Sequence, residues 1–123
     1  MGDISFNKSG ISYLRTFLGL SQAELAEEIG VSASIISRIE RLKRDLQLEE
    51  SNGLVELVRS MGLHFVPDGQ SLDGIVPEGT QRVGCDLYDR YTYRSPEGQE
   101  WCVGRGAVCL NHQPTWGWWI LEG

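Results

Sequence analysis

The residues best suited to chemistry lie in one short segment rich in serine and arginine. Small or cationic side chains recur there at the spacing of one helix face: Ala33, Ser34, Ser37, Arg38 and Arg41. Such groups fit a major groove, because hydroxyl and guanidinium groups hydrogen-bond to base edges and phosphates. The segment therefore predicts a surface that binds double-stranded DNA.

Two short helices joined by a glycine turn are expected to position this face. Gly30 can adopt the positive φ that reverses the chain, and Ser32 can start the second helix as its N-cap. Apolar residues at helical spacing then pack the helices together, with the small Ala26 at their closest approach. These residues are Leu25, Ala26, Ile29, Val31, Ile36 and Ile39. The same pattern also fits an ordinary helical hairpin with a solvated polar face.

Residues 20–40 resemble the motif of the lambda repressor and Cro-like (XRE family) helix-turn-helix regulators, L-S-Q-x-E-L-A-x-x-x-G-V-S-x-x-x-I-S-x-I-E. The resemblance covers residues 9–63 and implies a bundle of four or five helices that binds DNA. It also implies that Glu40 pairs with Arg15 of the first helix. Two departures concern the segment after the motif: Leu42 replaces the family's glycine, and residues 48–62 are longer than the usual spacing.

The resemblance also assigns roles to the polar residues. Gln22 would touch a phosphate, while Ala33, Ser34 and Arg38 would face base edges. Three others would lie beside the DNA backbone, and two further cations extend the cluster. Together the predicted DNA contacts are Gln22, Ser32, Ala33, Ser34, Ser37, Arg38, Arg41, Lys43 and Arg44. For the cations from position 41 to position 44, a solvated helix end favoured by the macrodipole is the alternative.

The charge of the chain qualifies this interpretation. Its 123 residues carry a net charge of −6, of which residues 1–66 contribute −2 and residues 67–123 contribute −4. Four of the seven cations of the first part lie between positions 38 and 44. Since charges beyond about 10 Å are screened at moderate salt, this local cluster governs docking more than the net charge does. We expect non-specific affinity to be weak and strongly salt-dependent.

Helical periodicity predicts an α+β fold whose first half is helical. The predicted helices cover residues 9–18, 22–29, 33–42 and 48–61, with Gly62 as the last C-cap and Gly53 as a point where the fourth can divide in two. A short apolar strand, 63–66, follows. The length allows one compact domain with an extension or two small domains. We predict a DNA-binding domain over 1–66, a linker over 67–79 and a β-rich region over 80–123.

The second half predicts a small antiparallel sheet and shows no family resemblance. Its strands are expected at 82–88, 90–94, 100–103, 107–110 and 116–121, with turns at 95–98, 104–106 and 111–114. Aromatic residues are dense there: Tyr88, Tyr91, Tyr93, Trp101, Trp116, Trp118 and Trp119. They predict a β core. Because Trp116 and Trp118 share one strand face and Trp119 lies on the other, an exposed tryptophan that anchors a partner is also expected.

The cysteines and histidines give no clear sign of a metal or a catalytic site. Cys85, Cys102 and Cys109 with His112 have the ligand types of a three-cysteine, one-histidine zinc site, yet they lack a second tight pair. Each cysteine falls in an apolar strand, so buried thiols are preferred, and His64 is expected to be a strand residue. No metal, cofactor or catalytic residue is predicted, because no nucleophile motif or phosphate-binding loop is present. We do not expect an enzyme.

The function predicted from these features is a transcriptional regulator, most naturally a repressor. A two-fold homodimer would place two recognition helices about 34 Å apart and read an inverted repeat. Strand 63–66 is expected to lack a partner in its own chain and to pair with its two-fold mate, although it can instead join its own sheet. The predicted interface comprises Leu63, Phe65, Trp116 and Trp118.

A second class of function fits the same sequence. In an antitoxin or a phage-encoded inhibitor, the β region would bind a protein target while the helix-turn-helix controls its own operon. Either protein would be cytoplasmic and independent of membranes, because the sequence has no run of about 18 apolar residues and no basic-then-apolar leader.

Overall fold

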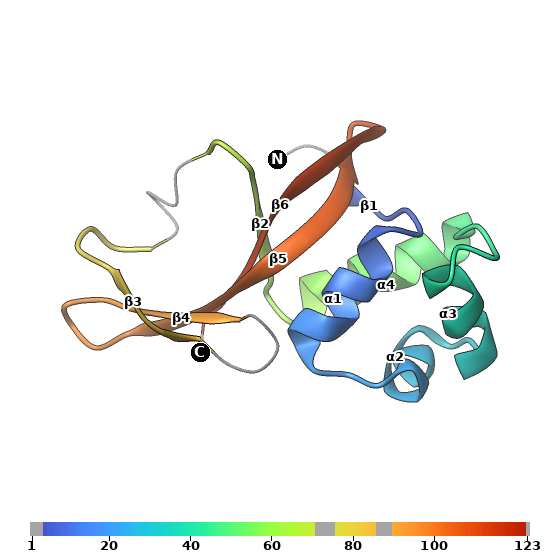
Figure 1. Ribbon diagram of the computed structural model, residues 1–123, viewed down its shortest axis with the longest axis horizontal. Coiled ribbons are helices and arrows are strands. Elements are labelled where there is room, and N and C mark those ends of the chain that lie inside the picture. Colours follow the sequence, from blue (N-terminus) through green and yellow to red (C-terminus); the bar gives the residue numbers. More distant parts are fainter. Residues whose placement is uncertain (1–3, 71–75, 86–89, 123) are drawn as a thin grey trace.

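Four helices lie to one side of an antiparallel sheet in the computed structural model, which describes residues 4–70, 76–85 and 90–122 (Figure 1). The helices are α1 (Gly10–Leu18), α2 (Gln22–Ile29), α3 (Ala33–Glu40) and α4 (Leu48–Ser60). The strands are β1 (Ile4–Ser5), β2 (His64–Pro67), β3 (Gln81–Cys85), β4 (Tyr91–Arg94), β5 (Glu100–Leu110) and β6 (Gln113–Glu122). The predicted α+β class is confirmed. Within the described residues, no fifth helix follows α4.

The helix boundaries agree with the periodicity of the apolar residues. The bounds of α2 match the prediction, while α3 ends two residues early, at Glu40. Gly53 does not divide α4. A Cβ added at Gly53 would lie 3.1 Å from the Cβ of Ile29, so the glycine allows α4 to approach α2 closely.

Each helix is followed by one residue in the left-handed region, which lets two backbone N–H groups bond back to the last turn. Three of these residues are glycines: Gly19 (φ 69°), Gly30 (φ 75°) and Gly62 (φ 69°). After α3 the residue is Leu42, with φ of 60°. There, Lys43 N donates to Arg38 O at 2.8 Å and Leu42 N donates to Ile39 O at 3.0 Å. A leucine thus occupies a position that glycine adopts without strain.

The sheet has the strand order β2-β6-β5-β4-β3, and β1 pairs with β5. The predicted turn at 104–106 is wrong, because β5 runs without interruption through these residues. A Cβ added at Gly104 would lie 2.3 Å from Phe17 Cδ1, and one at Gly106 would lie 2.5 Å from Trp119 Cδ1. These glycines therefore leave room for large side chains. The turn between β5 and β6 is a tight one at Asn111 and His112, with φ of 50° and 65°.

The strand that follows α4 belongs to the sheet of its own chain. The expectation that it lacks a partner there is wrong, since β2 pairs with β6 in the register His64 to Ile120 and Phe65 to Trp119. Leu63, just before it, is only 8% exposed and lies in the core. The structure thus shows the second arrangement considered for this strand.

The larger of two hydrophobic clusters joins the helices to the sheet, and the smaller one, made of Val66, Trp101, Val103 and Ile120, lies within the β region. Phe6, Phe17 and Trp119 lie in the same buried cluster as the packed residues of α1 to α4. Trp119 stacks on Phe6 at a ring-centroid distance of 5.9 Å and meets Phe65 edge-on at 5.1 Å. This packing gives α1 a fixed position against β5. The division into domains at residues 66 and 80 stays a prediction.

The remaining predictions for the β region have mixed outcomes. Trp101 and Trp119 are buried as a β core requires, whereas Trp116 is 46% exposed. Cys85 is exposed, so the expectation of a buried thiol is wrong there, while Cys102 and Cys109 are half-buried. Tyr88, at the end of the predicted strand 82–88, lies outside the described residues, as do linker residues 71–75.

Among the helices described, none is long and apolar enough to cross a membrane.

Candidate nucleic-acid interface

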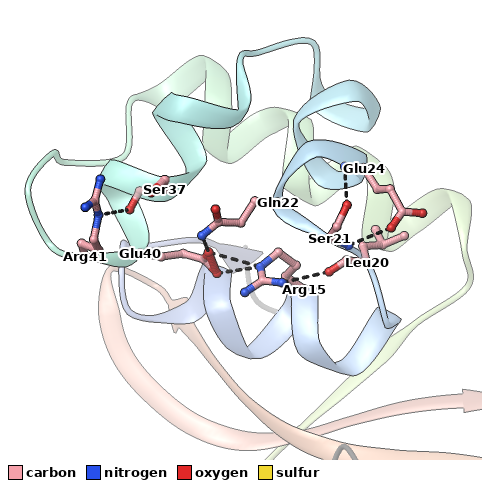
Figure 2. A network of polar contacts seen from close by, with 8 residues as sticks. All are labelled: Arg15, Leu20, Ser21, Gln22, Glu24, Ser37, Glu40 and Arg41. Atoms are coloured by element: carbon pink, nitrogen blue, oxygen red, sulfur yellow. Dashed lines mark hydrogen bonds and ion pairs between the residues drawn. The ribbon is translucent and has the colours of Figure 1, made fainter.

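A network of polar groups fixes the end of α3 against α1 and α2 (Figure 2). Arg15 Nε donates to Glu40 Oε1 at 2.7 Å and to Oε2 at 3.2 Å. Gln22 Nε2 donates to Glu40 Oε2 at 2.7 Å, and Arg15 Nη1 donates to the carbonyl oxygen of Leu20 at 3.0 Å. The side chain of Glu40 is only 7% exposed and that of Arg15 24%. The predicted pair of Arg15 and Glu40 is confirmed.

Gln22 has a role in this network that sequence reasoning missed. It was predicted as a phosphate contact, and its amide nitrogen here bridges the first turn of α2 to the last turn of α3. A group held in this way can present its remaining amide atoms in a fixed direction. The phosphate contact stays a prediction, and the bond to Glu40 would make that contact depend on the position of α3.

The start of α2 is fixed by a reciprocal pair of hydrogen bonds. Ser21 Oγ accepts from Glu24 N at 3.0 Å, and Glu24 Oε1 accepts from Ser21 N at 2.9 Å. The bonds from the backbone and side chain of Ser21 lower the pKa of Glu24, because they favour its ionised form. The sequence S-x-x-E before an apolar helix is the known signal for this capping box, and it was present at 21–24.

The predicted DNA-reading face of α3 is open. Figure 1 shows α2 and α3 at the end of the helical part that is farthest from the sheet. Ser34 and Arg38 are exposed, and Ser37 is half-buried. Ser32 precedes α3 as expected, yet its hydroxyl makes no capping bond and lies 3.1 Å from the hydroxyl of Ser34. The two hydroxyl groups therefore lie together at the exposed start of the helix, beside Ala33.

The cations of the helical part fall into two groups. Four contact a carboxylate: Lys8 with Asp45, Arg15 with Glu40, Arg44 with Glu50 and Arg59 with Glu56. The other three, Arg38, Arg41 and Lys43, are exposed and show no ion pair within the part of the chain that the structure describes. Arg41 Nε donates a long hydrogen bond to the carbonyl oxygen of Ser37, at 3.4 Å, which leaves its charge unpaired with any carboxylate among the described residues. Unmatched positive charge is thus concentrated at the end of α3.

Arg44 differs from its neighbours, although it was predicted with them as a DNA contact. Its Nη1 donates to both oxygens of Glu50, at 2.7 and 2.8 Å, and Glu50 is only 5% exposed. Burial raises the pKa of Glu50, but the bonds from Arg44 and from the backbone of Gln47, with the charge of Arg44, leave that pKa below its ordinary value. Arg44 therefore neutralises a buried carboxylate and joins the loop after α3 to α4.

The zinc alternative finds no support in the geometry. The cysteines lie on β3 and β5. Over the described ranges 4–70, 76–85 and 90–122, no group of three or more histidine, cysteine, aspartate or glutamate side chains is arranged to hold a metal ion.

The comparisons with known proteins agree with this geometry. The family model described as Helix-turn-helix matches residues 11–56, which is less than half of the chain and ends before the sheet begins. The β region matches no family. Comparison with curated proteins and with solved structures gave no significant match. Residues 11–56 are therefore a helix-turn-helix domain of the XRE family, the family that their sequence resembles.

Proposed function

We propose that this protein is a transcriptional repressor that binds an inverted-repeat operator as a homodimer. The coarser function, DNA-binding regulation, is supported by the helix-turn-helix domain. The observation that supports the DNA surface most strongly is the position of the unmatched cations. In a chain with a net charge of −6, Arg38, Arg41 and Lys43 lie together at one end of α3. DNA phosphate groups would supply the negative charges that these three cations lack within their own chain.

In the proposed complex, α3 enters the major groove with its first residues toward the bases. Ala33 and Ser34 are small, so the helix can approach the base edges closely. Arg38, one turn after Ser34, is long enough to donate two hydrogen bonds to a guanine. Arg41 and Lys43 would contact phosphates, with Gln22, Ser32 and Ser37 beside the backbone. Arg44 is omitted from this set because its charge is matched by Glu50.

For the dimer we favour an aromatic surface made of Tyr13, Arg105, Trp116 and Trp118. Trp116 is 46% exposed and meets Tyr13 edge-on at a ring-centroid distance of 5.2 Å. The guanidinium carbon of Arg105 lies 5.4 Å from the ring of Trp116 and 4.9 Å from that of Trp118. Exposed tryptophan, tyrosine and arginine are the residue types that dominate binding energy at interfaces. Leu63 and Phe65 are left out, because both pack within their own chain.

The dimer can be tested by the mass of the chain in light scattering at micromolar concentration. We expect a dimer. We also expect Trp116→Ser to raise the dissociation constant of the dimer by about 30-fold or more, the loss of affinity typical of an interface hot spot. Leu48→Ser is the matched control, since Leu48 is 75% exposed but lies at the start of α4. A monomeric wild type, or a dimer that Trp116→Ser leaves intact, would reject this interface. A monomer purified with a second protein would favour the antitoxin or inhibitor function.

A further inference from the structure

A cavity of about 280 Å³ lies on the face of the sheet that points away from the helices. Val103 and Ile120 pair across β5 and β6 and belong to the smaller hydrophobic cluster, whereas the neighbouring Cys102 and Trp119 pack into the larger cluster with the helices. Since side chains alternate between the two faces of a strand, the cavity lies on the opposite face. It is lined by Gln70, Arg82, Tyr91, Tyr93, Val103 and Trp118. Figure 1 shows β3 and β4, which supply three of these residues, at the end of the molecule farthest from α3.

Aromatic rings form the walls of this cavity. Tyr91 and Trp118 meet at a ring-centroid distance of 6.3 Å with their planes 64° apart, and Tyr93 packs against the same cluster. All three side chains are half-buried, while Val103 is only 3% exposed, as the floor of a cavity requires. Aromatic rings pair with other rings in offset-stacked or edge-on contacts. Walls of this kind therefore favour a flat, aromatic ligand.

Arg82 is the only charged residue among the described residues that line the cavity. The carbon of its guanidinium lies 5.0 Å from the ring centroid of Tyr91, and its side chain makes no ion pair within the ranges 4–70, 76–85 and 90–122. A guanidinium that stacks on a ring still presents the N–H groups along its edge, which match the two oxygens of a carboxylate. A cation, the other ligand that aromatic walls bind, would meet the like charge of Arg82.

From this arrangement we propose that the cavity binds a small aromatic carboxylate, with its ring between the tyrosine and tryptophan side chains and its carboxylate on Arg82. The volume is close to the lower end of the range of about 300–1,000 Å³ that small-molecule sites occupy, so the ligand is compact. A long anion such as single-stranded nucleic acid is a poorer match, because residues 67–123 carry a net charge of −4. The site goes beyond the proposed function and does not depend on DNA binding. Of the surface proposed for the dimer, it includes Trp118 alone.

Titration of the isotope-labelled full chain with cinnamate, followed by the amide signals in NMR spectra, tests the site. We expect saturable shifts at millimolar concentration that are centred on β4, β5 and β6, as befits a compact ligand. Cinnamamide has the same flat ring system without the charge, and it should bind about 3- to 10-fold more weakly. Choline, a cation that aromatic walls attract, should not shift these signals.

Three variants separate the charge from the rings. Arg82→Gln should weaken cinnamate by about 3- to 10-fold and leave cinnamamide unchanged. Arg94→Gln removes the same charge from the neighbouring strand, where Arg94 is paired with Glu100, and should bind cinnamate as the wild type does. Tyr91→Leu keeps apolar bulk but lacks the ring, so it should weaken both ligands.

The proposed site is wrong if cinnamate shifts no signal of β4 to β6, or if cinnamate and cinnamamide bind the wild type equally. Equal losses of cinnamate affinity in Arg82→Gln and Arg94→Gln would also overturn it, since the effect would then be that of net charge. Binding of choline in place of cinnamate would assign the cavity to a cation. None of these results bears on sequence selection by the helix-turn-helix, so the two proposals can fail separately.

Discussion

Replacing Glu40 with alanine should lower the free energy of unfolding by about 2–4 kcal/mol. The change leaves the guanidinium of Arg15, only 24% exposed, without its carboxylate, and it removes the acceptor of the Gln22 amide. The positive charge of Arg15 is then partly buried without a counter-charge. This lowers the stability of the fold by more than the intact ion pair contributes to it. Urea unfolding of the wild type and of Glu40→Ala measures the effect. DNA affinity should fall as well, because α3 loses its anchor to α1 and α2.

A control for this prediction is the surface pair of Glu56 and Arg59 on α4. Both side chains are about 70% exposed, so Glu56→Ala should cost less than about 0.5 kcal/mol. Glu40→Gln keeps the size of the side chain and one acceptor, and should fall between the wild type and Glu40→Ala. Unchanged unfolding of Glu40→Ala, or a loss equal to that of Glu56→Ala, would show that the network does not stabilise the domain.

Replacing Arg38 with alanine should cost about 1–3 kcal/mol on the operator, a loss in affinity of about 5- to 150-fold. The physical reason is the loss of a two-pronged hydrogen bond to one base, which no water molecule replaces with the same geometry. On scrambled DNA the loss should be much smaller. Titration of both duplexes with the wild type and the variant measures the difference.

Lys43→Ala is the matched control, since this cation is expected to contact a phosphate. It should weaken binding about equally on both duplexes and reduce the slope of log affinity against log salt by about one. Equal losses of Arg38→Ala on operator and scrambled DNA would make Arg38 a phosphate contact as well. In a reporter with the operator placed over a promoter, the wild type should lower expression and Arg38→Ala should restore it.

Local patterns explain why the helical part was predictable. The apolar residues of α2 and α3 repeat at helical spacing around Gly30, and α2 contacts α3 more extensively than it contacts α4. The pair of Arg15 and Glu40 followed from the family resemblance. The conformation of Leu42 was not foreseen, because the same backbone motif normally requires glycine.

The sheet was harder to predict because its contacts are distant in sequence. Gly104 and Gly106 resemble a turn when read locally, and only the side chains of Phe17 and Trp119 show that they belong inside β5. In the same way, β2 pairs with β6, which is about 50 residues further along the chain. The alternation of apolar residues and their β propensity can predict a strand, but they do not identify the strand that pairs with it.

The contacts of the cations that follow α3 were also difficult to predict from the sequence. From sequence alone, Arg44 is equivalent to Arg41 and Lys43. The loop after α3 brings it to the buried carboxylate of Glu50, and this contact depends on where α4 lies. Which cations remain available for phosphate is therefore a property of the folded chain.

Selection of bound sequences from a pool of random duplexes tests the central claim most directly. The wild-type chain should enrich an inverted repeat whose half-site centres lie about 34 Å apart, one turn of DNA, and Arg38→Ala should lose the preference at one base pair of each half-site. A pool with no enriched sequence after repeated selection would contradict the account of this protein as a sequence-specific DNA-binding regulator.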